Sequence, residues 1–137
     1  MRGKIFNPDE ANRMLPLVSR IAADIVATYR QVRQALEAFE TEKARAEAEP
    51  LRETELRRCD QAVARVLDRF QTLIEEVEAL GGTVKDYEQG GIDFYGEVEG
   101  EIVYLCWRPG DTRIKWFHRV DEGFSKRRPL PEHSLAS

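Results

Sequence analysis

Two stretches of the chain carry apolar residues at steps of three and four, the spacing that places side chains on one face of a helix. The first stretch consists of Val18, Ile21, Ile25, Tyr29, Val32, Leu36 and Phe39. The second consists of Leu56, Cys59, Val63, Val66, Phe70, Leu73, Val77 and Leu80. The sequence therefore predicts two long helices that pair through these stripes, as in an antiparallel coiled coil.

Local sequence signals mark the ends of the two helices. The Asn-Pro-Asp-Glu sequence starting at Asn7 supplies an N-cap, a proline suited to the first helical position and the glutamate of a capping box. Pro16 removes an amide donor soon afterwards, which favours a kink over a separate short segment. The Glu-Pro pair at 49–50 predicts the hairpin turn, and the Gly-Gly pair at 81–82 predicts the end of the second helix.

After residue 82 the composition changes to aromatic and β-branched residues with frequent glycine, which is typical of short antiparallel strands. The pattern predicts four strands in a meander, at residues 83–87, 91–98, 101–108 and 113–120. Alternation in the third strand assigns one face to Ile102, Tyr104 and Cys106, and the other to Val103, Leu105 and Trp107. Both faces are largely apolar, so we expect this strand to be central and covered on both sides.

These elements predict an α+β fold in a single domain spanning residues 1–132. A long two-helix hairpin over residues 7–81 precedes the four-stranded meander at 83–120, and an extended tail at 121–132 follows it. We expect residues 133–137 to fray. The length of 137 residues agrees with one domain.

Charge and apolar content narrow the function classes. The chain has 21 Lys and Arg against 25 Asp and Glu, a net charge of −4, which disfavours general nucleic-acid binding. It has no apolar window as long as a membrane helix, and its start lacks the apolar run of a secretion signal. Two cysteines are too few to stabilise the fold by disulfide bonds. Their number is consistent with reduced thiols. We therefore expect a cytoplasmic protein with no membrane partner.

The signature motifs of phosphate loops, zinc proteases, α/β-hydrolases and dinucleotide-binding folds are absent from the sequence. The strand-rich half instead carries polar residues that are candidates for catalysis or metal binding, namely His118, Asp93, Cys106 and Asp121. Imidazole titrates near neutrality and binds borderline metals, while carboxylates and thiolates complete such sites. Structural roles are favoured for His118, Asp93 and Cys106, and no cofactor is evident, so a divalent metal is the less favoured interpretation.

A basic triplet in the tail, consisting of Lys126, Arg127 and Arg128, is a candidate anion-binding group. Arginine suits two-pronged contacts with carboxylate or phosphate. The alternative is a solvated basic segment that pairs with the acidic body of the protein, and the sequence favours this alternative.

Several motifs together resemble one known family, the bacterial family of domain of unknown function 2203. They are the Phe-Asn-Pro-Asp-Glu-Ala-Asn opening at 6–12, Leu-Pro-Leu at 15–17, Gly-Ile-Asp-Phe at 91–94, Tyr-Leu-Cys-Trp at 104–107, Trp-Phe-His at 116–118, and the tail from Gly-Phe at 123–124 to Pro-Leu at 129–130. The sequence departs from the family pattern at Phe117, Arg119 and Lys126. The resemblance implies this organisation and a cytoplasmic bacterial setting, and it implies no activity.

The long helices and the missing catalytic signatures favour a non-enzymatic interaction or scaffold protein. The first helix carries more apolar surface than one partner helix hides, so we expect a homodimer that can bind another protein. A monomer whose sheet covers this surface is the alternative. The alternative function is a metal-binding or small-anion-binding protein, or an enzyme, that uses a polar cluster around His118.

Overall fold

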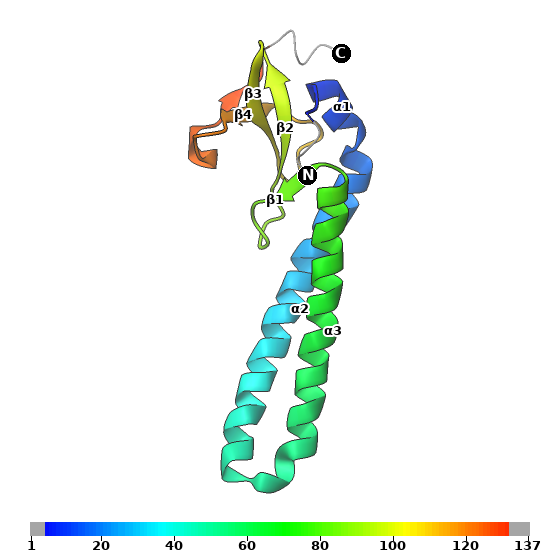
Figure 1. Cartoon of the computed structure of the whole chain (residues 1–137), viewed down its shortest axis with the longest axis vertical. Helices are drawn as coiled ribbons and strands as arrows, with labels where there is room; N and C mark the ends of the chain where they lie inside the picture. Colours follow the sequence, from blue (N-terminus) through cyan, green and yellow to red (C-terminus); the bar gives the residue numbers. More distant parts are fainter. Residues whose placement is uncertain (1–4, 132–137) are drawn as a thin grey trace.

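The computed structural model describes residues 5–131, and shows a long helical hairpin projecting from a small antiparallel sheet (Figure 1). The helical elements are α1 (Pro8–Arg13), α2 (Leu15–Ala48), the 3-10 turn η1 (Pro50–Arg52) and α3 (Glu53–Ala79). The others are β1 (Gly82–Val84), β2 (Ile92–Val98), β3 (Glu101–Trp107), β4 (Trp116–Arg119), the 3-10 turn η2 (Phe124–Lys126) and β5 (Arg128–Pro129). The predicted α+β class is confirmed.

The helical N-terminus follows the predicted capping chemistry. The Asn7 side chain accepts a hydrogen bond from the Glu10 amide, and the Glu10 side chain accepts one from the Asn7 amide. The predicted kink at Pro16 is wrong, because α1 ends before Met14 and α2 begins as a separate helix. Pro16 lies in the first turn of α2, where the missing amide hydrogen has no intrahelical partner to lose.

The two long helices pack side by side in the predicted antiparallel arrangement. The rings of Tyr29 and Phe70 have centroids 5.8 Å apart, and Arg69 Nε donates to Thr28 Oγ1 at 3.4 Å. The turn lies at the predicted Glu-Pro pair, since α2 ends at Ala48 and η1 begins at residue 50. After α3, Gly81 adopts a φ of 96°, which glycine tolerates without the steric cost of a Cβ.

The sheet has five strands in the order β1-β2-β3-β4-β5, so β3 is central as predicted. The predicted count of four is wrong, because part of the extended tail forms β5 and pairs with β4. Leu130 continues this attachment by donating its amide hydrogen to the Lys115 carbonyl at 2.8 Å. A two-residue pairing has too few positions to show alternation, so the sequence pattern did not indicate it. The predicted fraying at 133–137 lies outside the described residues.

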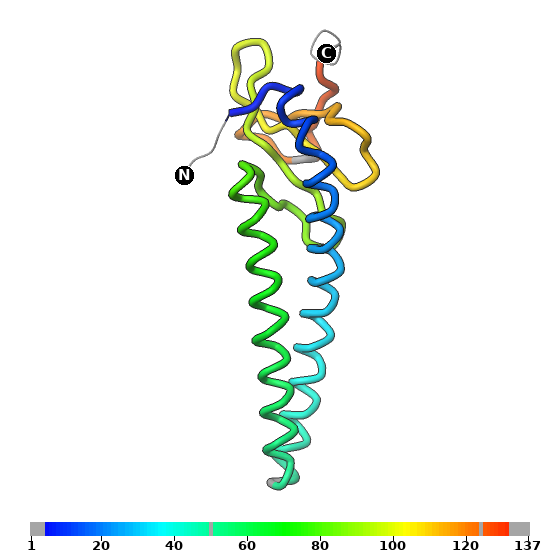
Figure 2. Tube along the Cα trace, turned by 90° about the vertical axis from the view of Figure 1, so that its right-hand side faces the viewer, coloured from blue at the N-terminus to red at the C-terminus, as the bar shows by residue number. Residues whose placement is uncertain are grey.

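The main core lies where the base of the hairpin meets one face of the sheet (Figure 2). Phe94 and Leu105 from the sheet pack there with Val18 and Ile25 of α2, and all four side chains are fully buried. Gly96 also lies on this face. A Cβ there would come to 2.5 Å from the Leu105 side chain, so this position requires glycine. The strand alternation was predicted correctly, and the opposite face of the sheet carries three of the four candidate polar residues.

Candidate functional site

Three of the four candidate residues converge on the face of the sheet opposite the main core. Asp93, Cys106 and His118 come from β2, β3 and β4 respectively. Asp93 is directly opposite Cys106, and His118 is opposite Tyr104, two residues along β3 on the same face. One potential ligand atom from each of the three residues lies within 4.8 Å of the other two. We refer to these three residues as the Asp-Cys-His cluster.

The Asp-Cys-His cluster is almost entirely removed from solvent. Asp93 is 4% exposed, Cys106 is 2% exposed and His118 is 4% exposed. Removing an ionisable group from water is unfavourable unless a hydrogen bond or an opposite charge compensates for the lost hydration. The partners of each of these three side chains therefore decide what the cluster can do.

The hydrogen bonds of His118 define which ring nitrogen faces the cluster. Nδ1 lies 2.9 Å from the Arg119 carbonyl oxygen, which can only accept, so Nδ1 carries a hydrogen. Nε2 lies 3.2 Å from Oδ2 of Asp93. In the neutral ring, the lone pair of Nε2 would then face a carboxylate oxygen. A proton or another cation between these two atoms is required to make the contact favourable.

The other two members of the cluster are shifted toward their protonated forms. Burial raises the pKa of the Asp93 carboxyl, and its hydrogen bonds with His118 and Cys106 only partly oppose this effect. Burial also raises the pKa of the Cys106 thiol, and the neighbouring Asp93 charge raises it further. The Asp-Cys-His cluster therefore resists carrying two negative charges without a compensating cation.

Aromatic and basic side chains surround the cluster. The Tyr104 ring lies 5.2 Å from the His118 ring and stacks on Tyr95 at 4.9 Å. The Tyr104 hydroxyl donates to the Tyr95 hydroxyl at 3.2 Å, and this bond, together with burial, raises the pKa of Tyr104 to about 12. Lys85 Nζ lies 5.0 Å from the Tyr104 ring centroid, and its charge favours ionised Asp93. Sequence reasoning missed Lys85. Thr83 pairs with Asp93 across the two strands, and alternation puts Lys85 on the same face as Thr83.

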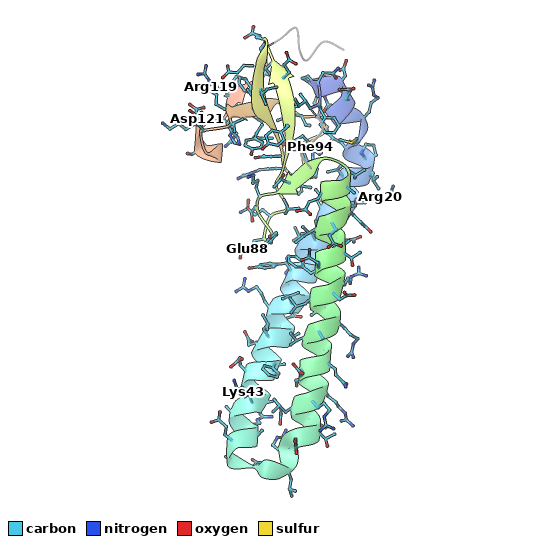
Figure 3. All side chains as sticks on the ribbon, viewed as in Figure 1. Arg20, Lys43, Glu88, Phe94, Arg119 and Asp121 are labelled. Atoms are coloured by element: carbon cyan, nitrogen blue, oxygen red, sulfur yellow. The ribbon has the colours of Figure 1, made fainter. Side chains whose placement is uncertain are left out.

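The fourth candidate does not join this group. Asp121 is exposed, in the turn after β4, and Figure 3 shows it on the far side of the sheet from α1. It is not one of the three residues whose ligand atoms converge. Its selection from sequence rested on closeness to His118 along the chain, and the turn carries its side chain outward.

The three basic side chains of the tail make different contacts. Arg128 donates to both carboxylate oxygens of Glu122, at 3.2 and 3.1 Å. The Arg127 guanidinium lies 5.1 Å from the Trp116 ring centroid, and its charge slightly opposes the rise in the pKa of Cys106. Lys126 is exposed in η2. The three side chains therefore have different surroundings, and Arg127 adds positive charge near the cluster.

Two donor atoms of the Asp-Cys-His cluster have the spacing that ligands of one small divalent transition metal adopt. An oxygen and a nitrogen that each lie about 2.0–2.1 Å from one tetrahedral zinc ion are about 3.3 Å apart. The observed separation of Asp93 Oδ2 and His118 Nε2 is 3.2 Å. The bond from Nδ1 of His118 to a backbone carbonyl is also the outer contact that metal-binding histidines commonly make.

Comparison with known proteins identifies a family. The family described as "Uncharacterized conserved protein (DUF2203)" matches residues 4–130. The chain belongs to this family. No curated protein and no solved structure matches the chain. In the described part of this DUF2203 protein, the helices are either too short or too polar to cross a membrane.

Proposed function

We propose that this DUF2203 protein binds one divalent transition-metal ion, with zinc favoured, through Asp93, Cys106 and His118. The observation that supports this most strongly is the contact between Nε2 of His118 and Oδ2 of Asp93 at 3.2 Å. Both atoms offer lone pairs when the imidazole is neutral and the carboxyl is ionised. A metal ion between them would satisfy both.

Charge balance in a buried site supports the same proposal. A divalent ion with one carboxylate, one thiolate and one neutral imidazole has no net charge, which is favourable for groups that are at most 4% exposed. Metal coordination deprotonates a thiol, so the raised pKa of Cys106 in the metal-free protein is compatible with the ion displacing its proton.

The donor set favours zinc over harder cations. Magnesium and calcium prefer oxygen ligands, whereas a site with nitrogen, oxygen and sulfur donors is typical of zinc. Because all ligand atoms lie within 4.8 Å of one another, small side-chain shifts of about 1 Å are enough to reach the spacing of a zinc site. The ion would join three adjacent strands and leave one coordination position for water or another ligand.

Zinc binding to tag-free, reduced and chelator-treated protein tests the proposal. A chromophoric chelator competes for the metal, and elemental analysis gives the stoichiometry. We expect one zinc ion per chain, with affinity reduced at least about tenfold in Cys106→Ser and in His118→Ala. Cys59→Ser is the matched control, because Cys59 is the other free cysteine and lies in α3. It should bind zinc as the parent protein does.

Circular dichroism identifies any variant that fails to fold, and Asp93→Asn then provides a nearly isosteric third test. Absence of stoichiometric zinc binding by the folded parent protein would contradict the proposal. Equal zinc affinity in the parent protein and in folded Cys106→Ser would show that the Cys106 thiolate is not a zinc ligand.

A second candidate function is self-association through the hairpin, as the apolar pattern of the sequence predicts. Five stripe residues of α3 are only half-buried in the single chain, namely Leu56, Cys59, Val63, Val66 and Phe70. Leu36 and Leu67 are 42% and 43% exposed. The contact of Tyr29 with Phe70 places these two leucines about one helical turn apart along the hairpin. We propose that a second copy covers this surface in a four-helix arrangement.

Light scattering at micromolar concentration tests this second proposal. We expect a dimer for the parent protein and a monomer for the double variant Leu36→Glu with Leu67→Glu. Leu51→Glu is the control, because Leu51 is 97% exposed at the hairpin tip and its replacement should leave the dimer intact. A monomeric parent protein would contradict self-association.

A further inference from the structure

A second polar site lies between α1 and the loop that joins β3 to β4. A cavity of about 380 Å³ is lined by Asp9, Asn12, Arg13, Thr112 and Arg113. All five side chains are polar or charged. The cavity therefore suits a small polar ligand, and its volume is within the range of ordinary ligand sites.

Asn12, which lines this cavity, carries a buried hydrogen-bond donor. Its Oδ1 accepts a hydrogen bond from the Ile114 amide at 2.6 Å, and because an amide N–H can only donate, this bond fixes the orientation of the side-chain amide. Nδ2 is thus also fixed. It is buried, and no acceptor for it exists among the described residues. A buried donor of this kind costs free energy unless a ligand or water accepts its hydrogen bond.

Charge around the cavity defines the ligand further. Arg13 and Arg113 bring two positive charges, and Asp9 brings one negative charge, so the lining has a net charge of +1. Guanidinium groups bind carboxylate and phosphate oxygens in two-pronged geometry. The single net charge suits a small oxyanion better than a polyanion such as a nucleic acid.

We infer that this cavity binds a small oxyanion, a carboxylate or phosphate group, which accepts hydrogen bonds from Asn12 Nδ2 and from the two arginines. The site belongs to different residues from the Asp-Cys-His cluster, and neither proposal depends on the other. The β3–β4 loop that carries Thr112 and Arg113 lies beside the N-terminal end of the helices in Figure 2, so the cavity forms only when these distant segments come together.

Titration of ¹⁵N-labelled protein with sodium phosphate, sodium acetate or sodium chloride at constant ionic strength tests the inference. We expect saturable shifts of the Asn12 side-chain amide and the Ile114 backbone amide with phosphate, acetate or both, and none with chloride. Saturation by phosphate alone assigns the site to phosphate groups, and saturation by acetate alone assigns it to carboxylates.

Asn12→Asp is the most informative variant, because it keeps the acceptor for the Ile114 amide and replaces the donor by a negative oxygen. We expect this variant and Arg113→Gln each to weaken anion binding at least about tenfold. Arg20→Gln is the charge-matched control, since Arg20 is exposed on α2 and projects outward in Figure 3. If Asn12→Asp does not fold, Arg13→Gln replaces it.

Three results would overturn the inference. The first is the absence of saturable shifts with both phosphate and acetate. The second is unchanged anion affinity in folded Asn12→Asp and Arg113→Gln. The third is an equal loss of affinity in Arg20→Gln, which would indicate general charge attraction.

Discussion

The hairpin and the sheet each bury a carboxylate, and the two differ in how that charge is compensated. Glu42 of α2 is 7% exposed, and the Arg52 guanidinium bonds to both of its carboxylate oxygens, one of them at 2.9 Å. Asp93 of β2 is 4% exposed, and its partners are an imidazole and a thiol. A permanent cation therefore accounts for the burial of Glu42, whereas the partners of Asp93 can themselves lose or share protons.

The two carboxyl groups show opposite pKa shifts for this reason. The hydrogen bonds from Arg52 lower the pKa of Glu42, whereas burial raises the pKa of Asp93. Arginine stays protonated at all ordinary pH values. Glu42 and Arg52 therefore form a structural ion pair that stabilises the hairpin tip. The two groups that hydrogen-bond to Asp93, the His118 imidazole and the Cys106 thiol, carry no such permanent charge, and a metal ion would supply it.

The largest expected effect is a zinc-dependent stabilisation that requires Asp93 and is independent of Glu42. Zinc at about 100 times its Kd should stabilise the folded protein by about 2.7 kcal/mol, because only the folded state assembles the three ligands. Thermal unfolding with and without zinc measures the effect. We expect Asp93→Asn to remove the stabilisation and Glu42→Gln to retain it. An equal zinc effect in both variants would break the distinction between the two carboxylates.

A smaller effect is an opposite pH dependence of the two carboxylates in chelator-treated protein. The folded pKa of Asp93 lies above its ordinary 3.8, so the folded state holds more protons, and stability falls as pH rises from that value through the raised pKa. The folded pKa of Glu42 lies below its ordinary 4.5, so its stabilisation is present above 4.5 and is lost as pH falls through the lowered pKa.

Denaturant unfolding at a series of pH values measures both slopes. The stability difference between the parent protein and Asp93→Asn should decrease with rising pH, and the difference between the parent protein and Glu42→Gln should increase. Slopes of the same sign for the two variants would contradict the assignment of one carboxylate to a fixed ion pair and the other to an incompletely compensated site.

The smallest expected effect is local and confined to the hairpin tip. Arg52→Gln removes the two-pronged contact with Glu42, so amide hydrogen exchange should become faster in residues 45–53 and stay unchanged in the sheet. Arg58→Gln is the control, because the Arg58 pair with Glu55 is formed by side chains that are 70% and 49% exposed. Exposed pairs contribute little, so exchange at the tip should be unaffected. Equal acceleration in both variants would show that the burial of Glu42 adds nothing.

Much of the architecture was predictable because its signals are periodic. The apolar steps of three and four gave both long helices, and the alternation around Cys106 gave the two faces of β3. The separate α1 was the less favoured alternative to a kink, and the two-residue β5 was missed, because each depends on one or two positions. At Pro16 the sequence showed a missing donor, but not whether the helix would bend or end there.

The candidate site was predictable in its residue types and only partly in its geometry. Alternation could not place His118 on the same face as Cys106, because the register of β4 depends on the loop that connects it to β3. The contact between Asn12 and Ile114 joins residues 102 positions apart in the chain, and such a pairing leaves no local pattern. Both sites therefore arise from tertiary contacts that bring ordinary polar residues together.

The most direct test of the central claim is the absorption spectrum of the metal-free protein after addition of one equivalent of cobalt(II). Cobalt replaces zinc in such sites and reports its ligands. We predict a thiolate-to-cobalt charge-transfer band with the visible bands of tetrahedral coordination, present in Cys59→Ser and lost in Cys106→Ser. A spectrum that matches cobalt in buffer alone, recorded on the folded parent protein, would contradict a metal site at Asp93, Cys106 and His118.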